Sequence, residues 1–285
     1  MKTLRVLGLA LVITTLSFWS KPIDATSDKY SASTQDKLAQ DVALAPCKDK
    51  ERKEAVKSLL VKMGAAPEDV AFEKLDGIEN VVLRKKGQSE EEIIIGAHYD
   101  KTAAGCGAID NWTGIVAIAH TYRSIRTTTT QKSLTFVAFG GEERGLLGSK
   151  AFARKIRKED AGRYCAMVNV DSLGMAADPQ VAENMSSKAL SQRAVEVALR
   201  LGMRIGRIEA PGAGADSVPF VEKRIPAVTL SALGDLYGEV LHTNKDQVAR
   251  VNMTSVHLGY RLMLELLAEL DGLACDANRD GAAKK

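Results

Sequence analysis

Seven histidine and carboxylate side chains occur in this chain where apolar runs give way to turns, and side chains of these types bind metal ions. They are His98, Asp100, Asp110, Glu142, Glu143, Asp171 and His242. Imidazole and carboxylate groups, with no thiolate among them, suit Zn²⁺ or Mn²⁺ in a hydrolytic centre. The set is large enough to hold two metal ions, so the sequence predicts metal-assisted hydrolysis.

His98 and Asp100 lie two residues apart, directly after an apolar run at 92–97. In an extended backbone, side chains at this spacing project to the same side. A metal-binding imidazole commonly donates its other N–H group to a carboxylate, which fixes the orientation of the ring. We therefore interpret Asp100 as the residue that orients His98, with direct binding of Asp100 to metal as the alternative.

Asp110 lies directly before a predicted helix, in the sequence IDNWTG. Its carboxylate could bind two cations, one through each oxygen, or it could simply cap the helix, since Asp is favoured at the N-cap.

Glu142 and Glu143 are adjacent, so their side chains point in different directions. One glutamate can then bind metal while the other acts as a general base toward an attacking water.

Apolar strand-like runs alternate with amphipathic helical segments along the chain. We expect strands at 70–75, 81–83, 92–97, 134–139, 166–170 and 227–230, and helices at 37–63 (interrupted by Pro46), 112–125, 146–155, 187–201 and 254–270. This alternation favours a single-domain, three-layer α/β/α fold, with a mostly parallel central sheet and helices on both faces. Ligands bind beyond the carboxyl ends of such strands, which is where His98, Glu142 and Asp171 occur.

The ends of the chain differ in composition from its middle. Lys2 and Arg5 precede an apolar run at 7–19, which is shorter than the roughly 20 residues needed to cross a bilayer. We therefore expect an export signal at 1–25, with an uncleaved anchor as the alternative. A disordered linker is expected at 26–35, the enzyme domain at 36–275 and a polar tail at 276–285.

The charge balance gives no sign of a polyanionic partner. Loss of residues 1–25 would change the formal net charge from +3 to about +1, so we expect neither nucleic-acid binding nor stable membrane association. The mixed-sign run at 48–54 is typical of a solvated helix face. We expect a secreted or periplasmic monomer.

Four cysteines in an exported chain can form two disulfides, with three possible pairings. Cys47 and Cys275 lie near opposite ends of the domain, whereas Cys106 and Cys165 lie within it. We expect bonds between Cys47 and Cys275 and between Cys106 and Cys165. Metal binding by cysteine is the weaker alternative, because no CxxC spacing is present.

Taken in order, the motifs GAHYD, IDNWTG, FGGEERGLLGS, NVDSLG and LHTNKD resemble those of the co-catalytic di-zinc aminopeptidases. This is the clan MH family, which also contains the glutaminyl cyclases, and the resemblance covers about 70–270. It implies that Asp110 bridges two zinc ions. One site is then completed by Glu143 and His242, and the other by His98 and Asp171.

The resemblance also assigns supporting roles. It implies that Glu142 is the general base, that Asp100 orients His98, and that the peptide bond from Asp110 to Asn111 is cis. Tyr237, five residues before His242, is expected to donate a hydrogen bond to the tetrahedral intermediate, with packing of a loop aromatic as the alternative.

One motif departs from the family pattern. Many relatives carry Ser-Asp-His before a Pro-Phe pair, whereas this chain has Ser217 in place of the histidine, so the side-chain preference does not carry over. The resemblance implies an exported zinc aminopeptidase that acts on peptides with a free amino terminus.

Three alternatives remain. A glutaminyl cyclase is disfavoured by the short ERGLLGS stretch, since cyclases usually carry a longer, Trp-containing segment there. A carboxypeptidase often carries an inserted domain, for which this chain has no room. A non-catalytic binding module is disfavoured because all the expected ligands and the base are present.

Overall fold

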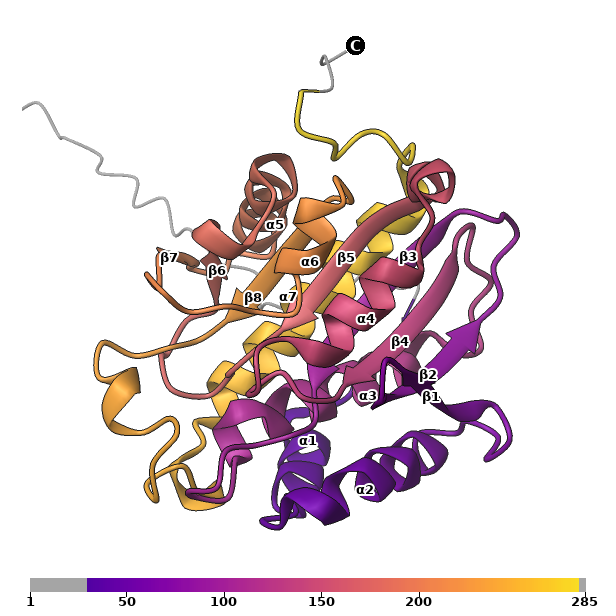
Figure 1. Ribbon diagram of the computed structural model, residues 1–285. Helices are drawn as coiled ribbons and strands as arrows, with labels where there is room; N and C mark the ends of the chain where they lie inside the picture. The colour runs from indigo at the N-terminus through magenta and orange to yellow at the C-terminus, as the bar shows by residue number, and fades with distance from the viewer. Residues whose placement is uncertain (1–29, 282–285) are drawn as a thin grey trace, which may run out of the picture.

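The computed structural model describes residues 30–281, which are built around an eight-stranded sheet. The order of the strands across the sheet is β1–β2–β4–β3–β5–β8–β6–β7 (Figure 1). Their bounds are Val70–Leu75 (β1), Ile78–Lys85 (β2), Glu92–His98 (β3), Ser133–Phe139 (β4), Tyr164–Val170 (β5), Gln180–Ala182 (β6), Gly206–Ile208 (β7) and Ala227–Ser231 (β8). The central strands β4, β3, β5 and β8 are parallel, while β1, β2 and β6 form antiparallel pairs toward the edges. The predicted mostly parallel sheet is therefore confirmed.

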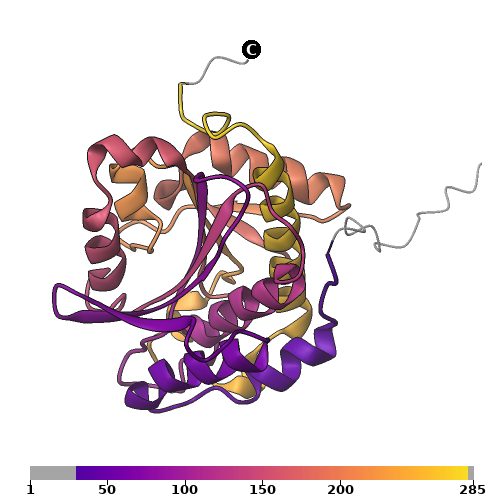
Figure 2. The same ribbon diagram turned by 90° about the vertical axis from the view of Figure 1, so that its right-hand side faces the viewer.

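Helices cover both faces of this sheet. Their bounds are Gln35–Val42 (α1), Asp49–Lys62 (α2), Thr113–Ile125 (α3), Leu147–Lys155 (α4), Lys188–Arg200 (α5), Val218–Glu222 (α6) and Met253–Gly272 (α7). The view along the sheet in Figure 2 shows α4 and α6 on one side and α3 and α7 on the other. The side chains of successive strand residues point to opposite faces of the sheet. Ile93 and Ile95 therefore pack with α3 and α7, while Ile94 packs with α4 and α6.

The predicted strands and helices are all present, with small shifts of their ends. The helix expected at 37–63 is two helices, α1 and α2, and Pro46 lies in the break between them. Strands β6 and β7 and helix α6 were not predicted. Strands of three residues and a helix of five are too short to produce a recognisable periodicity.

The ends of the described chain are more ordered than we expected. The export signal expected at 1–25, and residues 26–29, lie outside the described residues. The disorder expected up to residue 35 is wrong for 30–35, because Tyr30 and Ser33 are buried and the backbone N–H of Ser33 donates to the Tyr260 hydroxyl at 2.8 Å. The polar tail is held as far as residue 281: the carboxylate of Asp280 accepts a hydrogen bond from the backbone N–H of Ala189, at the start of α5.

The predicted disulfide pairing is wrong. Cys47 is bonded to Cys106, and Cys165 to Cys275. Cys47 lies just before α2, which packs against the loop after β3 that contains Cys106. Cys275 follows α7, whose end lies beside the start of β5 and hence beside Cys165. Position along the sequence was a poor guide to these contacts.

The run at 48–54 is not a fully solvated face. Arg52, in the middle of that run, is completely buried. Among residues 30–281, no helix combines the length and the apolar character needed to cross a membrane.

Candidate metal centre

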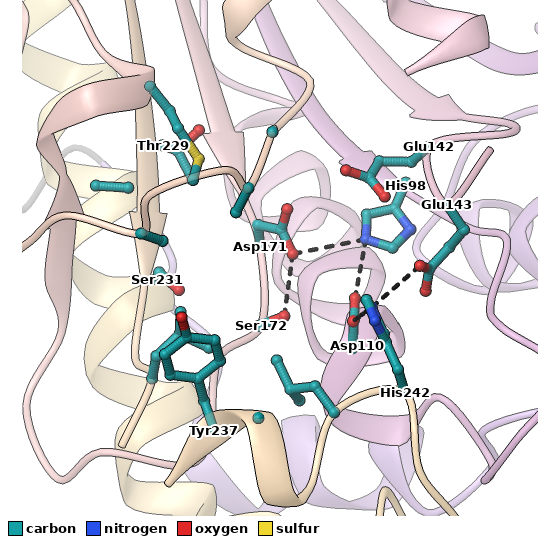
Figure 3. A pocket seen from close by; sticks show the side chains of 18 of the residues that line it. His98, Asp110, Glu142, Glu143, Asp171, Ser172, Thr229, Ser231, Tyr237 and His242 are labelled. Atoms are coloured by element: carbon teal, nitrogen blue, oxygen red, sulfur yellow. Dashed lines mark hydrogen bonds and ion pairs between the residues drawn. The ribbon is translucent and has the colours of Figure 1, made fainter. Parts of the chain in front are cut away.

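The predicted ligands meet at the carboxyl edge of the parallel strands. His98 is the last residue of β3, Asp171 directly follows β5, and Glu142 and Glu143 follow β4 after two glycines. Because these strands run in parallel, their ends present the side chains to a common space. The helical turn η1 (Ala108–Trp112) adds Asp110, and the loop after β8 adds the last ligand, His242, as Figure 3 shows.

Asp110 lies between two imidazoles. Its Oδ1 atom is 3.1 Å from Nε2 of His98, and its Oδ2 atom is 3.1 Å from Nε2 of His242. Each carboxylate oxygen therefore faces a different histidine, and the residue is 6% exposed. This is the arrangement expected of a carboxylate shared by two cations.

A second carboxylate completes each half of the centre. Oδ1 of Asp171 lies 3.5 Å from Nε2 of His98, and Oε2 of Glu143 lies 3.1 Å from Nε2 of His242. Within each half, including Asp110, the three donor atoms lie within 4.8 Å of one another. The five predicted ligands thus form two groups of three that share one residue.

The donor chemistry fits two divalent cations. Two imidazoles and three carboxylates are the ligand types that zinc takes in catalytic sites. The Oε1 atom of Glu143 is buried and has no hydrogen-bond partner among the described residues. Since an unpaired buried carboxylate oxygen is costly, a cation at this position would stabilise it.

The carboxylates also stabilise the protonated, positively charged forms of His98 and His242. Hydrogen bonds to Asp110 and Glu143 raise the pKa of His242 to about 10. Burial lowers the pKa of His98, but the charge of Glu142 and the hydrogen bonds to Asp110 and Asp171 outweigh burial and raise it well above its ordinary value. The cluster therefore favours cations strongly, and protons and metal ions would compete for the same nitrogen atoms.

Glu142 faces the same space from its own direction (Figure 3). Burial raises the pKa of Glu142 to about 9; the charge of His98 opposes this rise, and those of Asp171 and Asp216 add to it. Asp216 is completely buried, and burial raises its pKa to about 7. Cations bound beside Glu142 would favour its charged form, which is the form a general base needs.

Asp100 contacts the site residues differently from our prediction, in which its carboxylate oriented His98. Its carboxylate is 3.8 Å from Nδ1 of His98, beyond hydrogen-bonding distance, and the ring nitrogen instead donates to the Asp100 backbone carbonyl at 3.1 Å. The carboxylate accepts hydrogen bonds from the backbone N–H groups of Glu142 (3.0 Å) and Glu143 (3.3 Å). Asp100 therefore positions His98 through its backbone and the glutamate pair through its side chain.

The backbone around Asp110 is held on two sides. The expected cis peptide bond from Asp110 to Asn111 is present. The Asn111 side chain is completely buried, donates to the carbonyl of Val170 at 2.8 Å, and accepts from the N–H of Ser172 at 3.1 Å. These bonds tie the turn that carries Asp110 to the end of β5, next to Asp171.

Sequence reasoning did not assign a role to Asp246. Its carboxylate accepts hydrogen bonds from the backbone N–H groups of Ile109 at 2.8 Å and Asp110 at 3.1 Å. The sequence feature that could have indicated this role is the position of Asp246 in the LHTNKD motif, four residues after His242.

A cavity of about 610 Å³ opens beside the metal ligands. Its wall away from them is mostly apolar and includes Ala182, Met185, Ile208, Ala210, Ala213 and Leu233, together with the hydroxyl residues Thr229 and Ser231. Tyr237 also lines the cavity and is 38% exposed. Ser217, which replaces the family's histidine, is buried, and its hydroxyl donates to the carbonyl of Met185 at 2.6 Å.

Comparison with known proteins agrees with this geometry. The sequence profile of peptidase family M28 matches residues 80–267. A probable leucine aminopeptidase from Trichophyton verrucosum is 32% identical in an alignment 143 positions long, which covers 45% of this chain and 38% of that protein. This chain spans less than half the length of the curated relatives it matches, for example 22% and 45% in two cases.

Solved structures share the fold. The zinc aminopeptidase BSAP from Bacillus subtilis superposes with a TM-score of 0.61 at 22% identity, covering 71% of this chain and 53% of that one. A glutaminyl cyclase from an Acidobacteriales bacterium superposes with a TM-score of 0.70 at 14% identity, covering 85% of this chain and 96% of that one. At these identities the likeness concerns the fold alone.

Proposed function

This chain belongs to peptidase family M28, and we propose that it is a zinc aminopeptidase that removes residues from the free amino terminus of peptides. The observation that carries the proposal is the position of Asp110, whose two carboxylate oxygens each lie 3.1 Å from a different histidine. Relatives named aminopeptidases support the reaction type.

The proposed cofactor is a pair of zinc ions. His98 and Asp171 would hold one ion, Glu143 and His242 the other, and Asp110 both. The buried, unpaired Oε1 atom of Glu143 and the close grouping of the donor atoms support this assignment. The name of the structural neighbour BSAP, a zinc aminopeptidase, supports the choice of metal.

Bound zinc ions would polarise the scissile carbonyl and increase the acidity of the attacking water. Glu142 would accept a proton from that water and then deliver it to the leaving amine. Asp100 holds the backbone of Glu142 through the N–H group of that residue, which keeps the base pointed into the cavity. We further propose that the Tyr237 hydroxyl donates a hydrogen bond to the substrate oxygen as negative charge develops there.

The apolar wall of the cavity would receive the side chain of the amino-terminal residue. The wall carries no charged group, which supports uncharged, apolar side chains over acidic or basic ones.

We propose that the protein is exported and acts on peptides as a secreted or periplasmic monomer. Its two disulfides are compatible with an oxidising compartment. The apolar run at 7–19 after Lys2 and Arg5 is typical of an export signal.

Hydrolysis of a panel of amino-acid p-nitroanilides would test the proposal. The expected result is release of p-nitroaniline from unblocked apolar amino acids, lost on chelation, restored by zinc, and nearly abolished in Glu142→Ala. Amino-acetylated substrates serve as the matched control and should not be cleaved. If zinc-loaded protein cleaves no unblocked substrate, cyclisation of amino-terminal glutamine and carboxypeptidase activity become the alternatives to measure.

A further inference from the structure

The loop that joins β3 to η1 covers residues 99–107 and contains no helix or strand. It begins directly after one proposed metal ligand, His98, and ends three residues before the shared ligand, Asp110. The position of Asp110 therefore depends on how firmly this loop is held.

Arg52, from helix α2, forms the centre of the contacts with this loop. It is completely buried, and its guanidinium donates hydrogen bonds to the backbone carbonyls of Tyr99, Cys106 and Gly107, the last two at 3.1 Å. It also donates to the carbonyl of Pro46 at 3.1 Å. One planar side chain thus joins both ends of the loop to the segment before α2.

A covalent bond and a capping carboxylate reinforce these contacts. The disulfide from Cys47 to Cys106 places the two Cα atoms 4.1 Å apart. The Asp49 carboxylate, in the first turn of α2, accepts a hydrogen bond from the backbone N–H of Lys101 at 3.0 Å. We call Cys47, Asp49 and Arg52 the α2 clamp.

The clamped loop residues lead directly to the metal centre. The carbonyl of Gly107 accepts hydrogen bonds from both Arg52 and the backbone N–H of Trp112, at the far end of the turn that carries Asp110. The N–H of Cys106 donates to the carbonyl of Asp246 at 2.7 Å. Displacement of this loop would therefore move the residues that hold Asp110.

Neither lysine nor methionine would serve at position 52 as well as arginine. Burial lowers the pKa of Arg52 to about 10, and the charges of Asp110 and Asp49 oppose that effect, so the side chain stays charged at neutral pH. A lysine carries the charge but lacks the planar fork of donors that reaches several carbonyls at once. A methionine would leave buried carbonyls unpaired.

We propose that the α2 clamp positions the loop at 99–107 and thereby sets the affinity of the centre for metal. The inference rests on the metal centre assigned above but not on the reaction assigned to it. All three clamp residues precede residues 80–267, which match the family. Arg52 is a positioning residue in this account, because it acts through the loop.

The test is a competition titration of Zn²⁺ against a chromophoric chelator, with the full-length protein purified in its oxidised, metal-free form. The clamp variants are Arg52→Lys, Arg52→Met and the double variant Cys47→Ser/Cys106→Ser. Two controls match them. Lys57→Met alters a residue of the same helix that donates to the carbonyl of Val70 instead, and Cys165→Ser/Cys275→Ser removes the other disulfide, at the amino end of β5.

We expect the clamp variants to bind zinc at least about tenfold more weakly, which is the usual loss when groups supporting metal ligands are altered. Arg52→Lys should lose less than Arg52→Met. The controls should keep wild-type affinity even where their melting temperatures fall. The bond between Cys165 and Cys275 closes a longer segment than the bond between Cys47 and Cys106, 110 residues against 59. Its removal in the control should therefore cost at least as much stability as removal of the clamp disulfide.

Wild-type affinity in folded clamp variants would overturn the inference, as would an equal loss of affinity in the controls. Circular dichroism identifies the folded variants. If Arg52→Met does not fold, Arg52→Lys and the disulfide variant decide the result. Because the readout is metal affinity, a failure of the proposed aminopeptidase reaction would leave this test valid.

Discussion

The carboxylate of Asp246 accepts a hydrogen bond from the backbone N–H of Asp110 at 3.1 Å, although 136 residues separate the two in the sequence. A second bond, from the N–H of Ile109, occupies the other carboxylate oxygen. The loop that supplies His242 to one half of the centre thus also fixes the carboxylate that both halves share.

Asp246→Asn should therefore weaken zinc binding by about tenfold. An asparagine side chain has one acceptor oxygen, and its NH₂ group would face a backbone N–H donor. Competition titration measures the effect, and the neighbouring exposed residue supplies the control, Lys245→Ala. Equal zinc affinity in Asp246→Asn and wild type would show that Asp110 is held without this contact.

The two adjacent glutamates should respond in different ways. Glu142→Gln should lower kcat by about 10² to 10⁴, the usual contribution of a general base, while zinc content stays at the wild-type level. Glu143→Gln should lose zinc from one half of the centre. Steady-state kinetics with metal analysis of the same samples separates these outcomes; loss of zinc from Glu142→Gln would assign that residue to metal binding instead.

Tyr237→Phe should lower kcat by about tenfold or more with unchanged zinc content, because the lost hydroxyl would act mainly as charge develops on the substrate. Leu236→Ala, at an exposed neighbouring residue, controls for disturbance of the loop. A kcat within twofold of wild type would leave Tyr237 as a packing residue of the cavity wall.

A buried histidine away from the centre should make stability depend on pH. Nε2 of His120 lies 3.0 Å from the Asp41 carboxylate, and Nδ1 lies 2.8 Å from the Ser33 hydroxyl. Burial lowers the pKa of His120 below 6.5, although Asp41 opposes this effect. The unfolded chain then binds the proton more readily, so this contribution is present above about pH 6.5 and is lost as the pH falls below it.

His120→Gln should therefore show a smaller decrease in melting temperature between about pH 7 and pH 5 than the wild type, even if the variant is less stable throughout. His257→Gln should change the pH dependence of the melting temperature in the same direction, because burial also lowers the pKa of His257. Thermal melts of metal-free protein across this range measure both. Parallel curves for His120→Gln and wild type would contradict the assignment.

Three of the ligands, His98, Glu143 and Asp171, could be predicted because each lies at or just after the end of a strand that the apolar pattern reveals. Once the strands are parallel, their carboxyl ends meet, so His98 and Asp171 must lie close together whatever the details of the loops. The family resemblance then supplied the division of the ligands between two sites. The cis bond after Asp110 was predictable on the same ground.

The remaining features depend on how distant loops meet, which local patterns do not encode. Arg52 occurs in a run of mixed charge, and only the tertiary position of α2 shows that its partners are backbone carbonyls. The same contact decides that Cys47 pairs with Cys106. Asp246 is likewise an ordinary polar loop residue until the loop is placed beside Asp110.

The central claim is that two metal ions share Asp110, and anomalous diffraction at the zinc absorption edge from crystals of the zinc-loaded protein tests it most directly. We predict two peaks, one on each side of the Asp110 carboxylate. One should contact His98 and Asp171, and the other Glu143 and His242. A single peak in fully loaded crystals, or two peaks that do not both contact Asp110, would contradict the account.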